Sequence, residues 1–377
     1  MIHQQKLGIL GGGQLGRMLI QSALDLNFYT LVLDPDPQAP CKTICNEFYV
    51  GSFADYDTVY EFGKRCTTVT IEIEHVNCDA LEQLEKEGIQ VHPSPKVIRL
   101  VQDKGLQKQF YKENNIPTAP FHLLQDRASL REFEDFLPAF QKLRTSGYDG
   151  KGVTRLKSST DFIDNAFDAP SVLEQLVPFE KEIAVLCARN KLGEVEVYDP
   201  IEMDFHPEHN MVEFLFAPAK INVEIAEKAT AIATEVIEKL KVVGLLAVEM
   251  FVTKDGEILV NEVAPRPHNS GHHTMRATLT SQFEQHLRAV LHLPLGACDT
   301  LWPSVLVNLL GEDGHTGDAK YDGLEEVLQV PGAYVHLYGK AKTKPFRKMG
   351  HVIVLDKKLS RAREKAIFVK QTLKVIA

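Results

Sequence analysis

Long apolar segments are absent from this 377-residue chain, in which no stretch stays apolar over the roughly 18 residues that a membrane span needs. Positive charge is not in excess, since 42 lysines and arginines face 51 aspartates and glutamates and the formal net charge is −9. These absences argue against a membrane protein and against nucleic acid as a bulk partner, and leave room only for local basic pockets. No internal repeat and no low-complexity segment is evident.

Paired cysteine motifs are also missing. The six cysteines are scattered at positions 41, 45, 66, 78, 187 and 298, without a Cys-x-x-Cys unit. Such thiols are typical of reduced structural residues, and they do not favour a disulfide framework or a zinc site. The N-terminus leads straight into an apolar strand, without the charged region, apolar core and cleavage site of a signal peptide. We therefore expect a cytoplasmic protein.

What is present is an ordinary globular composition, with 44% hydrophobic and 25% charged residues. The chain is long enough for two or three domains with large cores. The run His92-Pro93-Ser94-Pro95 interrupts the pattern of strands and helices, and predicts a domain edge shortly after it.

A glycine loop follows the first strand. Gly11, Gly13 and Gly16 have the G-x-G-x-x-G spacing, a helical pattern follows, and Asp34 ends the second strand about 20 residues on. Three interpretations stay open: a dinucleotide site, a loop that holds the phosphate or ring of another substrate, or tight packing of strand on helix. A later strand ends at Glu72 and Glu74, where ligands bind in open α/β sheets; a solvated loop is the alternative.

Lysines and a second glycine loop come next. A helix is predicted from Lys96 to Asn115, and Lys104 and Lys108 would share one face of it, by default a solvated face. The strand Ala139–Leu143 carries Lys142, and the segment 145–153, TSGYDGKGV, follows it. This glycine-rich loop could close over phosphates, although it lacks the G-K-[ST] of a Walker A motif; a plain hairpin turn is the alternative.

The segment 248–266, VEMFVTKDGEILVNEVAPR, predicts a β-hairpin. A two-residue turn at Asp255-Gly256 would place Glu249 opposite Glu262, with Phe251 and Val260 as the apolar pair beside them. Two opposed carboxylates repel, and a divalent cation such as Mg²⁺ would relieve that repulsion. The alternatives are two exposed glutamates, or a three-residue loop that shifts the register.

Donor-rich segments follow the hairpin. The run Arg266-Pro-His-Asn-Ser-Gly-His-His273 comes first, and the spacing of its last two histidines does not fit a standard zinc site. From about Leu295 the chain is predicted to be β-rich, with a basic loop at 340–348 and a final helix from Leu359 to Val375. The segment from Met203 to Asn210 is predicted to be a loop.

Taken together, GGGQLGRM, GYDGKG and NE-x-APR-x-HNSGH resemble the ATP-grasp superfamily, and more narrowly its N5-carboxyaminoimidazole ribonucleotide synthetases, over essentially the whole chain. The resemblance implies an α/β and α+β fold, with an N-terminal Rossmann-like (pre-ATP-grasp) domain at 1–100, an ATP-grasp domain at 101–295 and a small β-rich C-terminal domain at 296–377. A lid subdomain would span about 118–177.

The resemblance also implies a nucleotide site. Lys142 would hold the ATP phosphates and Glu182 the ribose, and Lys104 stands where the family usually has an arginine, keeping the charge but losing the planar fork. Glu249 and Glu262 would ligate Mg²⁺, or Mn²⁺, with Asn261 beside them. The other nucleotide-binding residues would be Gly147, Tyr148, Asp149, Gly150, Lys151, Gly152, Val153, Glu174, Gln175, Leu176, Val177 and His206.

A second set of residues would bind the aminoimidazole ribonucleotide, with Lys340 and Arg347 at its phosphate. This set comprises Gly13, Gln14, Leu15, Glu74, Asp149, Lys151, His268, Asn269, Ser270, Lys340 and Arg347. The catalytic residues would be Lys142, Asp149, Lys151, Arg266, His268 and Asn269.

The implied reaction is carboxylation of aminoimidazole ribonucleotide with ATP and bicarbonate, by way of carboxyphosphate, in a homodimeric enzyme of purine biosynthesis. The first alternative is a formate-dependent glycinamide ribonucleotide transformylase, which would share the N-terminal glycine loop. A NAD-dependent oxidoreductase would use Gly11–Gly16 and Asp34, but would leave GYDGKG and the glutamate pair without a role. A non-catalytic nucleotide-binding regulator would be expected to lack a metal ligand.

Overall fold

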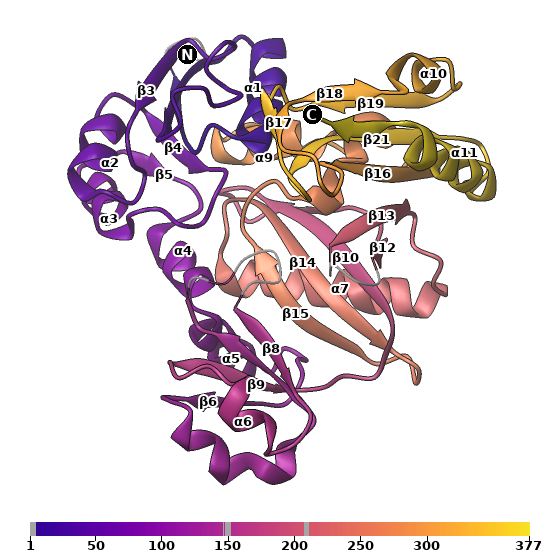
Figure 1. Cartoon of the computed structure of the whole chain (residues 1–377). Helices are drawn as coiled ribbons and strands as arrows, with labels where there is room; N and C mark the ends of the chain where they lie inside the picture. Colours follow the sequence, from indigo (N-terminus) through magenta and orange to yellow (C-terminus); the bar gives the residue numbers. More distant parts are fainter. Residues whose placement is uncertain (1–4, 146, 148–151, 207–210) are drawn as a thin grey trace.

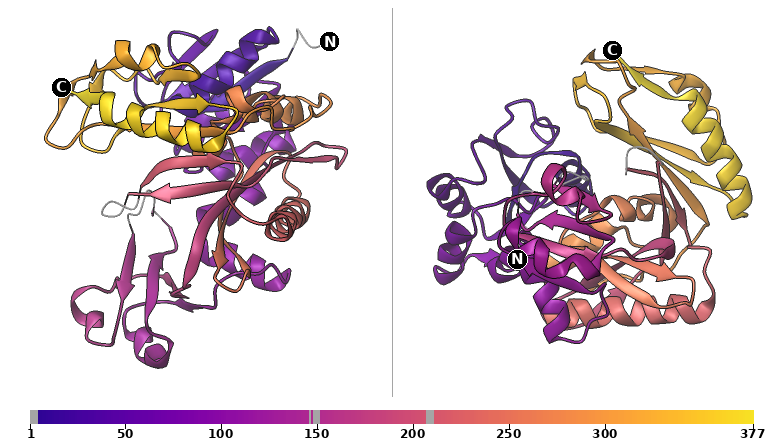
Figure 2. Two further views of the ribbon diagram at one scale, coloured as in Figure 1. Left: turned by 90° about the vertical axis from the view of Figure 1, so that its right-hand side faces the viewer. Right: turned by 60° about the horizontal axis from the view of Figure 1, so that its bottom comes forward.

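The computed structural model describes residues 5–145, 147, 152–206 and 211–377. Figure 1 shows the N-terminal sheet and the C-terminal strands near each other, with a small antiparallel sheet at the opposite end. The left view of Figure 2 gives the same arrangement, with the small sheet far from helix α11. In the described part of the chain, no helix is both long and apolar enough to cross a membrane.

A parallel sheet in the order β3-β2-β1-β4-β5 forms the N-terminal domain. Leu7 and Ile9 of its central strand pack on the α1 side, and Leu10 packs on the side of α2 and α3. Helices therefore cover both faces, which explains the continuous apolar runs of the central strands. The elements are β1 (Lys6–Leu10), α1 (Gln14–Asp25), β2 (Tyr29–Asp34), β3 (Glu47–Val50), α2 (Tyr56–Gly63), β4 (Thr68–Ile71), α3 (Cys78–Lys86) and β5 (Gln90–Val91).

Two helices, α4 (Pro95–Gln102) and α5 (Lys104–Glu113), link this domain to the rest of the chain. The prediction of one continuous helix was wrong because Asp103 adopts an extended backbone and caps α5. Its carboxylate accepts hydrogen bonds from the backbone N–H of Gly105 at 2.7 Å and of Leu106 at 3.2 Å. The same carboxylate pairs with Arg144 at 2.6 Å, so the cap also ties α5 to the end of the strand that carries Lys142.

Replacing Asp103 with alanine should lower the free energy of unfolding by about 1–2 kcal/mol, because both capped N–H groups and the arginine lose their partner. Asp103→Asn keeps an acceptor for the cap and should lose less. Chemical denaturation of both variants measures the difference. An Asp103→Ala variant within about 0.5 kcal/mol of wild type would contradict this role for the cap.

The small sheet is antiparallel, in the order β6-β9-β7-β8, and lies within the segment predicted to be a lid subdomain. Its strands are β6 (Phe121–Leu124), β7 (Ala139–Leu143), β8 (Val153–Leu156) and β9 (Ser171–Gln175), with the short helices η2 (Ala128–Phe136) and α6 (Asp161–Asp164). Phe140 pairs with Glu174 across β7 and β9. Because side chains alternate along a strand, Lys142 and Glu174 lie on the same face.

A nine-stranded sheet joins the middle of the chain to its C-terminal part, in the order β15-β14-β10-β12-β13-β16-β21-β19, with β11 pairing with β10. Its first six strands along the chain are β10 (Phe179–Arg189), β11 (Val195–Val197), β12 (Ile201–Phe205), β13 (Val212–Ala217), β14 (Gly244–Thr253) and β15 (Ile258–Ala264). The prediction of a loop from Met203 to Asn210 was wrong for residues 203–205, which lie in β12, and residues 207–210 are outside the described part.

The C-terminal strands β16 (Ser304–Leu310), β19 (Ala333–Leu337) and β21 (Lys348–Leu355) continue that sheet through the pairing of β16 with β13. Helix α7 (Val223–Leu240) packs on the β10–β14 region, and α11 (Leu359–Thr372) packs on β16 and β21. The remaining elements are η3 (Asn269–Gly271), α8 (Thr274–Ala277), α9 (Gln282–Val290), β17 (Gly317–Asp318), β18 (Lys320–Asp322), α10 (Leu324–Leu328), β20 (Lys342–Thr343) and β22 (Lys374–Ile376).

The hairpin β14–β15 pairs Glu249 with Glu262, which confirms the predicted pairing. The predicted two-residue turn was wrong. Thr253 donates its N–H to the carbonyl of Glu257 at 2.9 Å, which leaves three residues in the loop, and Gly256 has φ +79°. That backbone conformation favours glycine. Phe251 consequently pairs with Leu259 and not with Val260.

A β-bulge restores the register between this loop and the glutamates. Met250 pairs with Val260 and Glu249 pairs with Glu262, so Asn261 is the extra residue. A bulge re-aims side chains at the point where it occurs. Asn261 and Glu262 therefore both stand opposite Glu249, and Asn261 Oδ1 accepts a hydrogen bond from Lys142 Nζ at 3.2 Å.

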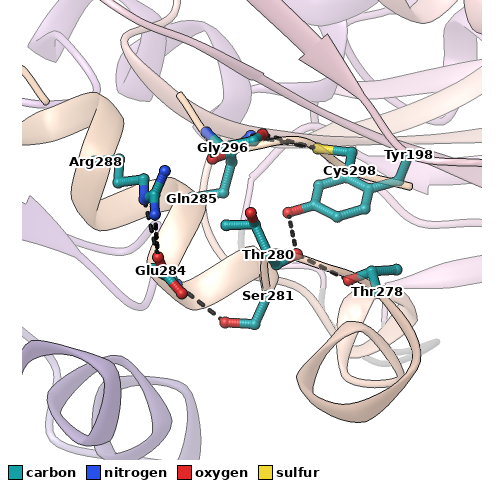
Figure 3. Close-up of polar contacts among 9 residues, drawn as sticks. All are labelled: Tyr198, Thr278, Thr280, Ser281, Glu284, Gln285, Arg288, Gly296 and Cys298. Atoms are coloured by element: carbon teal, nitrogen blue, oxygen red, sulfur yellow. Dashed lines mark hydrogen bonds and ion pairs between the residues drawn. The ribbon is translucent and has the colours of Figure 1, made fainter. Parts of the chain in front are cut away.

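Buried polar contacts anchor the start of helix α9 (Figure 3). Ser281 caps the helix by accepting the N–H of Glu284 at 3.2 Å. Gln285 bonds Gly296 twice, accepting its N–H at 2.8 Å and donating to its carbonyl at 2.6 Å. The Tyr198 hydroxyl donates to the carbonyl of Thr280 at 3.1 Å. These bonds fix the first turn of α9 against the sheet.

Candidate active site

Three lysines and two carboxylates from four separate elements converge on one cavity. Lys104 Nζ of α5 lies 2.7 Å from Glu262 of β15. Lys142 Nζ of β7 lies 2.8 Å from Glu174 of β9, and Lys108 Nζ of α5 lies 2.5 Å from that same glutamate. Asn261 completes the polar lining, together with Gln107 and Val172. The cluster therefore joins α5, the small antiparallel sheet and the hairpin β14–β15.

Glu174 and Lys108 form the most buried ion pair of the cluster, with side chains only 4% and 5% exposed. Burial opposes ionisation of Glu174, but Lys142 and Lys108 together hold the pKa of its carboxyl below the ordinary value. Burial lowers the pKa of Lys108 to about 8, against the opposing attraction of Glu174. Glu174 is thus the shared anion between two lysines, and Lys108 lies in the interior and not on the solvated face predicted for it.

The paired glutamates respond oppositely to their surroundings. Burial, and next the charge of Glu262, raise the pKa of Glu249. Lys104 lowers the pKa of Glu262. Among the described residues, no group of three or more histidine, cysteine, aspartate or glutamate side chains could hold a metal by itself. Two facing carboxylates fit Mg²⁺, which commonly takes one or two carboxylates and completes its shell with phosphates and water.

The loop after β15 brings His268 to the glutamate pair. Its Nε2 lies 3.6 Å from Glu249 Oε1. Its Nδ1 accepts the backbone N–H of Ser270 at 3.4 Å and lies 2.9 Å from the Ser270 hydroxyl. Asn269 and Ser270 lie beside it in η3. Arg266 Nε lies 2.8 Å from Glu74 Oε1 at the edge of the N-terminal sheet, so this loop spans the junction of the two domains.

The N-terminal glycine loop already binds carboxylates of its own domain. Gly13 and Gly16 donate their N–H groups to Glu72 at 2.9 and 2.7 Å, and Gly12 donates to Asp34 at 2.6 Å. In a dinucleotide site, these amides and Asp34 would bind pyrophosphate and ribose. The oxidoreductase alternative therefore loses its site, and the Gly13 amide is not available to a substrate in this conformation. Gln14 and Leu15 open helix α1 beside the loop.

Other predicted nucleotide residues surround the cluster. Glu182 of β10 pairs with Phe251 of the neighbouring strand, and burial raises its pKa to about 7. Gln175 ends β9, and Leu176 and Val177 follow it; the Leu176 N–H bonds the carbonyl of Pro138 at 3.3 Å.

Only part of the predicted glycine-rich loop lies within the described residues. Val153 pairs with Lys142, and Gly152 accepts the N–H of Leu143 at 2.8 Å. Gly147 lies within the described residues, and His206 follows β12. The predicted residues Tyr148, Asp149, Gly150 and Lys151 lie outside the described residues.

The predicted phosphate-binding residues lie on the C-terminal part of the chain. Lys340 Nζ donates to the carbonyl of Lys348 at 2.8 Å, and Arg347 donates to the carbonyl of Lys342 at 2.6 Å. Lys348 begins β21 and Lys342 lies in β20, so only part of the predicted basic loop is irregular. Both predicted side chains donate to backbone carbonyls of the C-terminal strands.

Sequence reasoning missed two residues that the structure brings to the site. Lys108 was given a surface position, because its spacing from Lys104 alone cannot show that both face the interior. Gln282, which is 0% exposed, was not predicted to have a role, because a glutamine at the start of a helix belongs to no recognisable motif.

Three family models match the chain in succession: a ribonucleotide synthetase pre-ATP-grasp domain at residues 4–102, an ATP-grasp domain at 109–283 and a phosphoribosylaminoimidazole carboxylase C-terminal domain at 304–365. The N5-carboxyaminoimidazole ribonucleotide synthase of Brucella melitensis is 38% identical over 92% of this chain and 95% of its own. The chain also matches phosphoribosylaminoimidazole carboxylases, such as those of Vigna aconitifolia and Ogataea methanolica, of whose length it spans 65% and 70%.

Solved structures agree over the full length. N5-carboxyaminoimidazole ribonucleotide synthetase from Thermotoga maritima is 44% identical, with a TM-score of 0.91 over 99% of both chains. The Aspergillus clavatus enzyme, in complex with ADP and 5-aminoimidazole ribonucleotide, is 33% identical, with a TM-score of 0.89 over 98% of this chain and 100% of that one. The predicted fold, with its pre-ATP-grasp and C-terminal domains, is thus confirmed. The chain belongs to the N5-carboxyaminoimidazole ribonucleotide synthases of the ATP-grasp superfamily.

Proposed function

We propose that this protein carboxylates 5-aminoimidazole ribonucleotide with ATP and bicarbonate, giving N5-carboxyaminoimidazole ribonucleotide, ADP and phosphate in purine biosynthesis. The observation that carries the proposal is the convergence of Lys104, Lys142 and the pair Glu249–Glu262 where lid, hairpin and α5 meet. Lysines and a cation held by two carboxylates are what transfer of a γ-phosphoryl group requires. Family membership supplies the substrate class.

Glu249 and Glu262 are the residues that would hold Mg²⁺ or Mn²⁺. When bound, the cation would screen the phosphate oxygens and favour their attack by an anion. Lys104 and Lys142 would bind the phosphates in place of the carboxylates that they contact now. Gln175, Leu176 and Val177 would edge the adenine, and Glu182 would accept the ribose hydroxyls.

The chemistry begins with a bicarbonate oxygen attacking the γ-phosphorus, which forms carboxyphosphate and releases ADP. The exocyclic amine of the ribonucleotide then attacks the carboxyl carbon and displaces phosphate, or it attacks CO₂ after carboxyphosphate has broken down to CO₂ and phosphate. In both routes the amine loses a proton as the carbamate forms. Carboxyphosphate is short-lived in water, so the site must exclude water and hold the amine close. We assign this task to Arg266, His268 and Asn269, with Asp149 and Lys151 from the glycine-rich loop and Lys340 and Arg347 at the substrate phosphate.

ADP release measures this function. It should require ATP, a divalent cation, bicarbonate and aminoimidazole ribonucleotide together, and the product should carry label from ¹³C-bicarbonate. Release without dependence on the ribonucleotide would leave the fold assignment in place and remove this substrate. Formate with glycinamide ribonucleotide would then be the next pair to supply, since a transformylase of the same superfamily uses them. ATP binding without turnover would instead indicate a regulator.

The same proposal includes a cytoplasmic location and assembly with a second copy of the chain. All six cysteines are free, which suits a reducing compartment. Light scattering should give twice the 42.3 kDa of one chain.

A further inference from the structure

A buried glutamine forms two hydrogen bonds with the backbone of His268. Gln282, the first residue of α9, is 0% exposed. Its Oε1 accepts the N–H of His268 at 2.8 Å, and its Nε2 donates to the carbonyl of His268, also at 2.8 Å. The side-chain amide thus bonds both polar backbone groups of one residue, as a neighbouring strand would. His268 is the residue whose ring lies at the glutamate pair.

The rest of the loop is shaped around the same amide. Gln282 Nε2 also lies 3.0 Å from His272 Nδ1. The Gln282 N–H donates to the Thr274 hydroxyl at 2.8 Å, and that hydroxyl donates to the carbonyl of Gly271 at 2.6 Å. A Cβ on Gly271 would come within 2.4 Å of Gln282 Oε1 and 2.3 Å of Leu186. The glycine is therefore required for the amide to reach the loop.

These hydrogen bonds to the backbone hold His268 where its ring points toward the glutamate pair. Because Nδ1 accepts the Ser270 N–H, the hydrogen-bond pattern places the ring proton of neutral His268 on Nε2. Nε2 lies 3.6 Å from Glu249, on the side of the site where the cation and the phosphates would bind. A backbone shift of about 1 Å at His268 would move the Nε2 donor away from this position in the site. Such shifts can lower a reaction rate by about 10²-fold.

We propose that Gln282 is a positioning residue for carboxyl transfer: by fixing the His268 backbone, it holds the ring so that the carboxyl group passes to the substrate amine and not to water. This inference rests on the proposed function. In productive transfer, the amine forms the N–C bond, loses a proton and displaces phosphate. In the wasteful reaction, water attacks instead, and bicarbonate and phosphate return to solution. The ratio of ADP formed to carbamate formed distinguishes the two outcomes.

The chain offers a matched control on the same helix. Gln285 is also 0% exposed and also clamps one residue from both sides, through the N–H of Gly296 at 2.8 Å and its carbonyl at 2.6 Å. Figure 3 shows this clamp near Cys298, among contacts that include none of the lysine–carboxylate cluster. Loss of either amide should cost similar stability. Only loss of Gln282 should disturb His268.

The test compares Gln282→Met with Gln285→Met, which keep most of the side-chain volume and remove both hydrogen bonds. We expect both to lower Tm. We expect Gln282→Met alone to raise the ratio of ADP to carbamate by at least about tenfold, with KM for ATP within about twofold of wild type. A ratio near that of wild type in Gln282→Met, or an equal rise in both variants, would overturn the proposal.

Gln282→Glu keeps an acceptor for the His268 N–H and loses the two Nε2 contacts, so it provides a second readout if the methionine variant does not fold. It should give an intermediate ratio, and a wild-type ratio would count against the proposal. Wild-type protein that makes no carbamate at all would refute the proposed function itself. Failure of the further inference looks different: wild type and Gln282→Met would then both form one carbamate for each ADP.

Discussion

Replacing Glu262 with glutamine is expected to lower cation-dependent ADP release by about 10²–10³-fold. Glu262 is both the partner of Lys104, at 2.7 Å, and one of the two facing carboxylates. Glutamine keeps the size of the side chain but removes the charge that would hold a cation and orient the lysine. The measurement is ADP release at saturating ATP, bicarbonate and ribonucleotide, over a titration of Mg²⁺ and of Mn²⁺.

Glu257→Gln is the matched control, since Glu257 lies exposed at the turn of the same hairpin. It should leave ADP release within about twofold of wild type. Glu249→Gln should weaken activation by the cation in the same direction as Glu262→Gln. If Glu262→Gln kept most of its activity at low Mg²⁺, the two carboxylates would not be the cation site, and the lysine cluster would need another explanation.

The pairing of these glutamates shows what the sequence could and could not predict. Alternation along the strands and a turn at Asp255-Gly256 were enough to place Glu249 opposite Glu262. Two errors cancelled in that prediction: the loop has three residues, and Asn261 forms a bulge. Strand propensity alone specifies neither the length of the loop nor the position of a bulge.

The glycine loop illustrates a second limit. Its spacing correctly predicted a strand, a tight turn and a helix. The amides of Gly13 and Gly16 bind Glu72, which lies 59 and 56 residues farther along the chain. A carboxylate from the same domain satisfies the helix N-terminus as well as a phosphate would. The motif therefore fixed the local fold and left the ligand undetermined.

Lys108 illustrates the third limit, because helix periodicity gives a face but not what covers it. The face with Lys104 and Lys108 is covered by β9 and β15, whose residues lie more than 60 positions away. Lys108 donates to Thr118 at 2.6 Å, and that hydroxyl donates to the carbonyl of Val260 at 2.7 Å. The ion pair with Glu174 offsets part of the cost of burying the charge of Lys108.

Replacing Lys108 with methionine should therefore lower the free energy of unfolding by about 1–3 kcal/mol, because Glu174 keeps only Lys142 as a partner and the Thr118 hydroxyl loses its donor. Lys142 would then be held more tightly by Glu174, and ADP affinity should fall by about tenfold. Lys112→Met, at an exposed position of the same helix, is the control and should change neither quantity. Denaturant titration and calorimetric binding of ADP measure both effects. A Lys108→Met variant as stable as the control would contradict the buried ion pair.

The pH dependence separates the charge of Lys108 from its packing. Its pKa of about 8 in the folded protein lies below the ordinary 10.5. Between pH about 8 and 10.5, Lys108 has lost its proton in the folded protein but keeps it in the unfolded chain. This group therefore makes the free energy of unfolding rise with pH. Over the same range the ion pair with Glu174 is lost. ADP affinity should accordingly fall as pH rises through about 8, without a loss of stability from this group. Lys108→Arg stays charged at that pH, so its ADP affinity should persist. An equal fall in wild type and Lys108→Arg would assign the titration to another group.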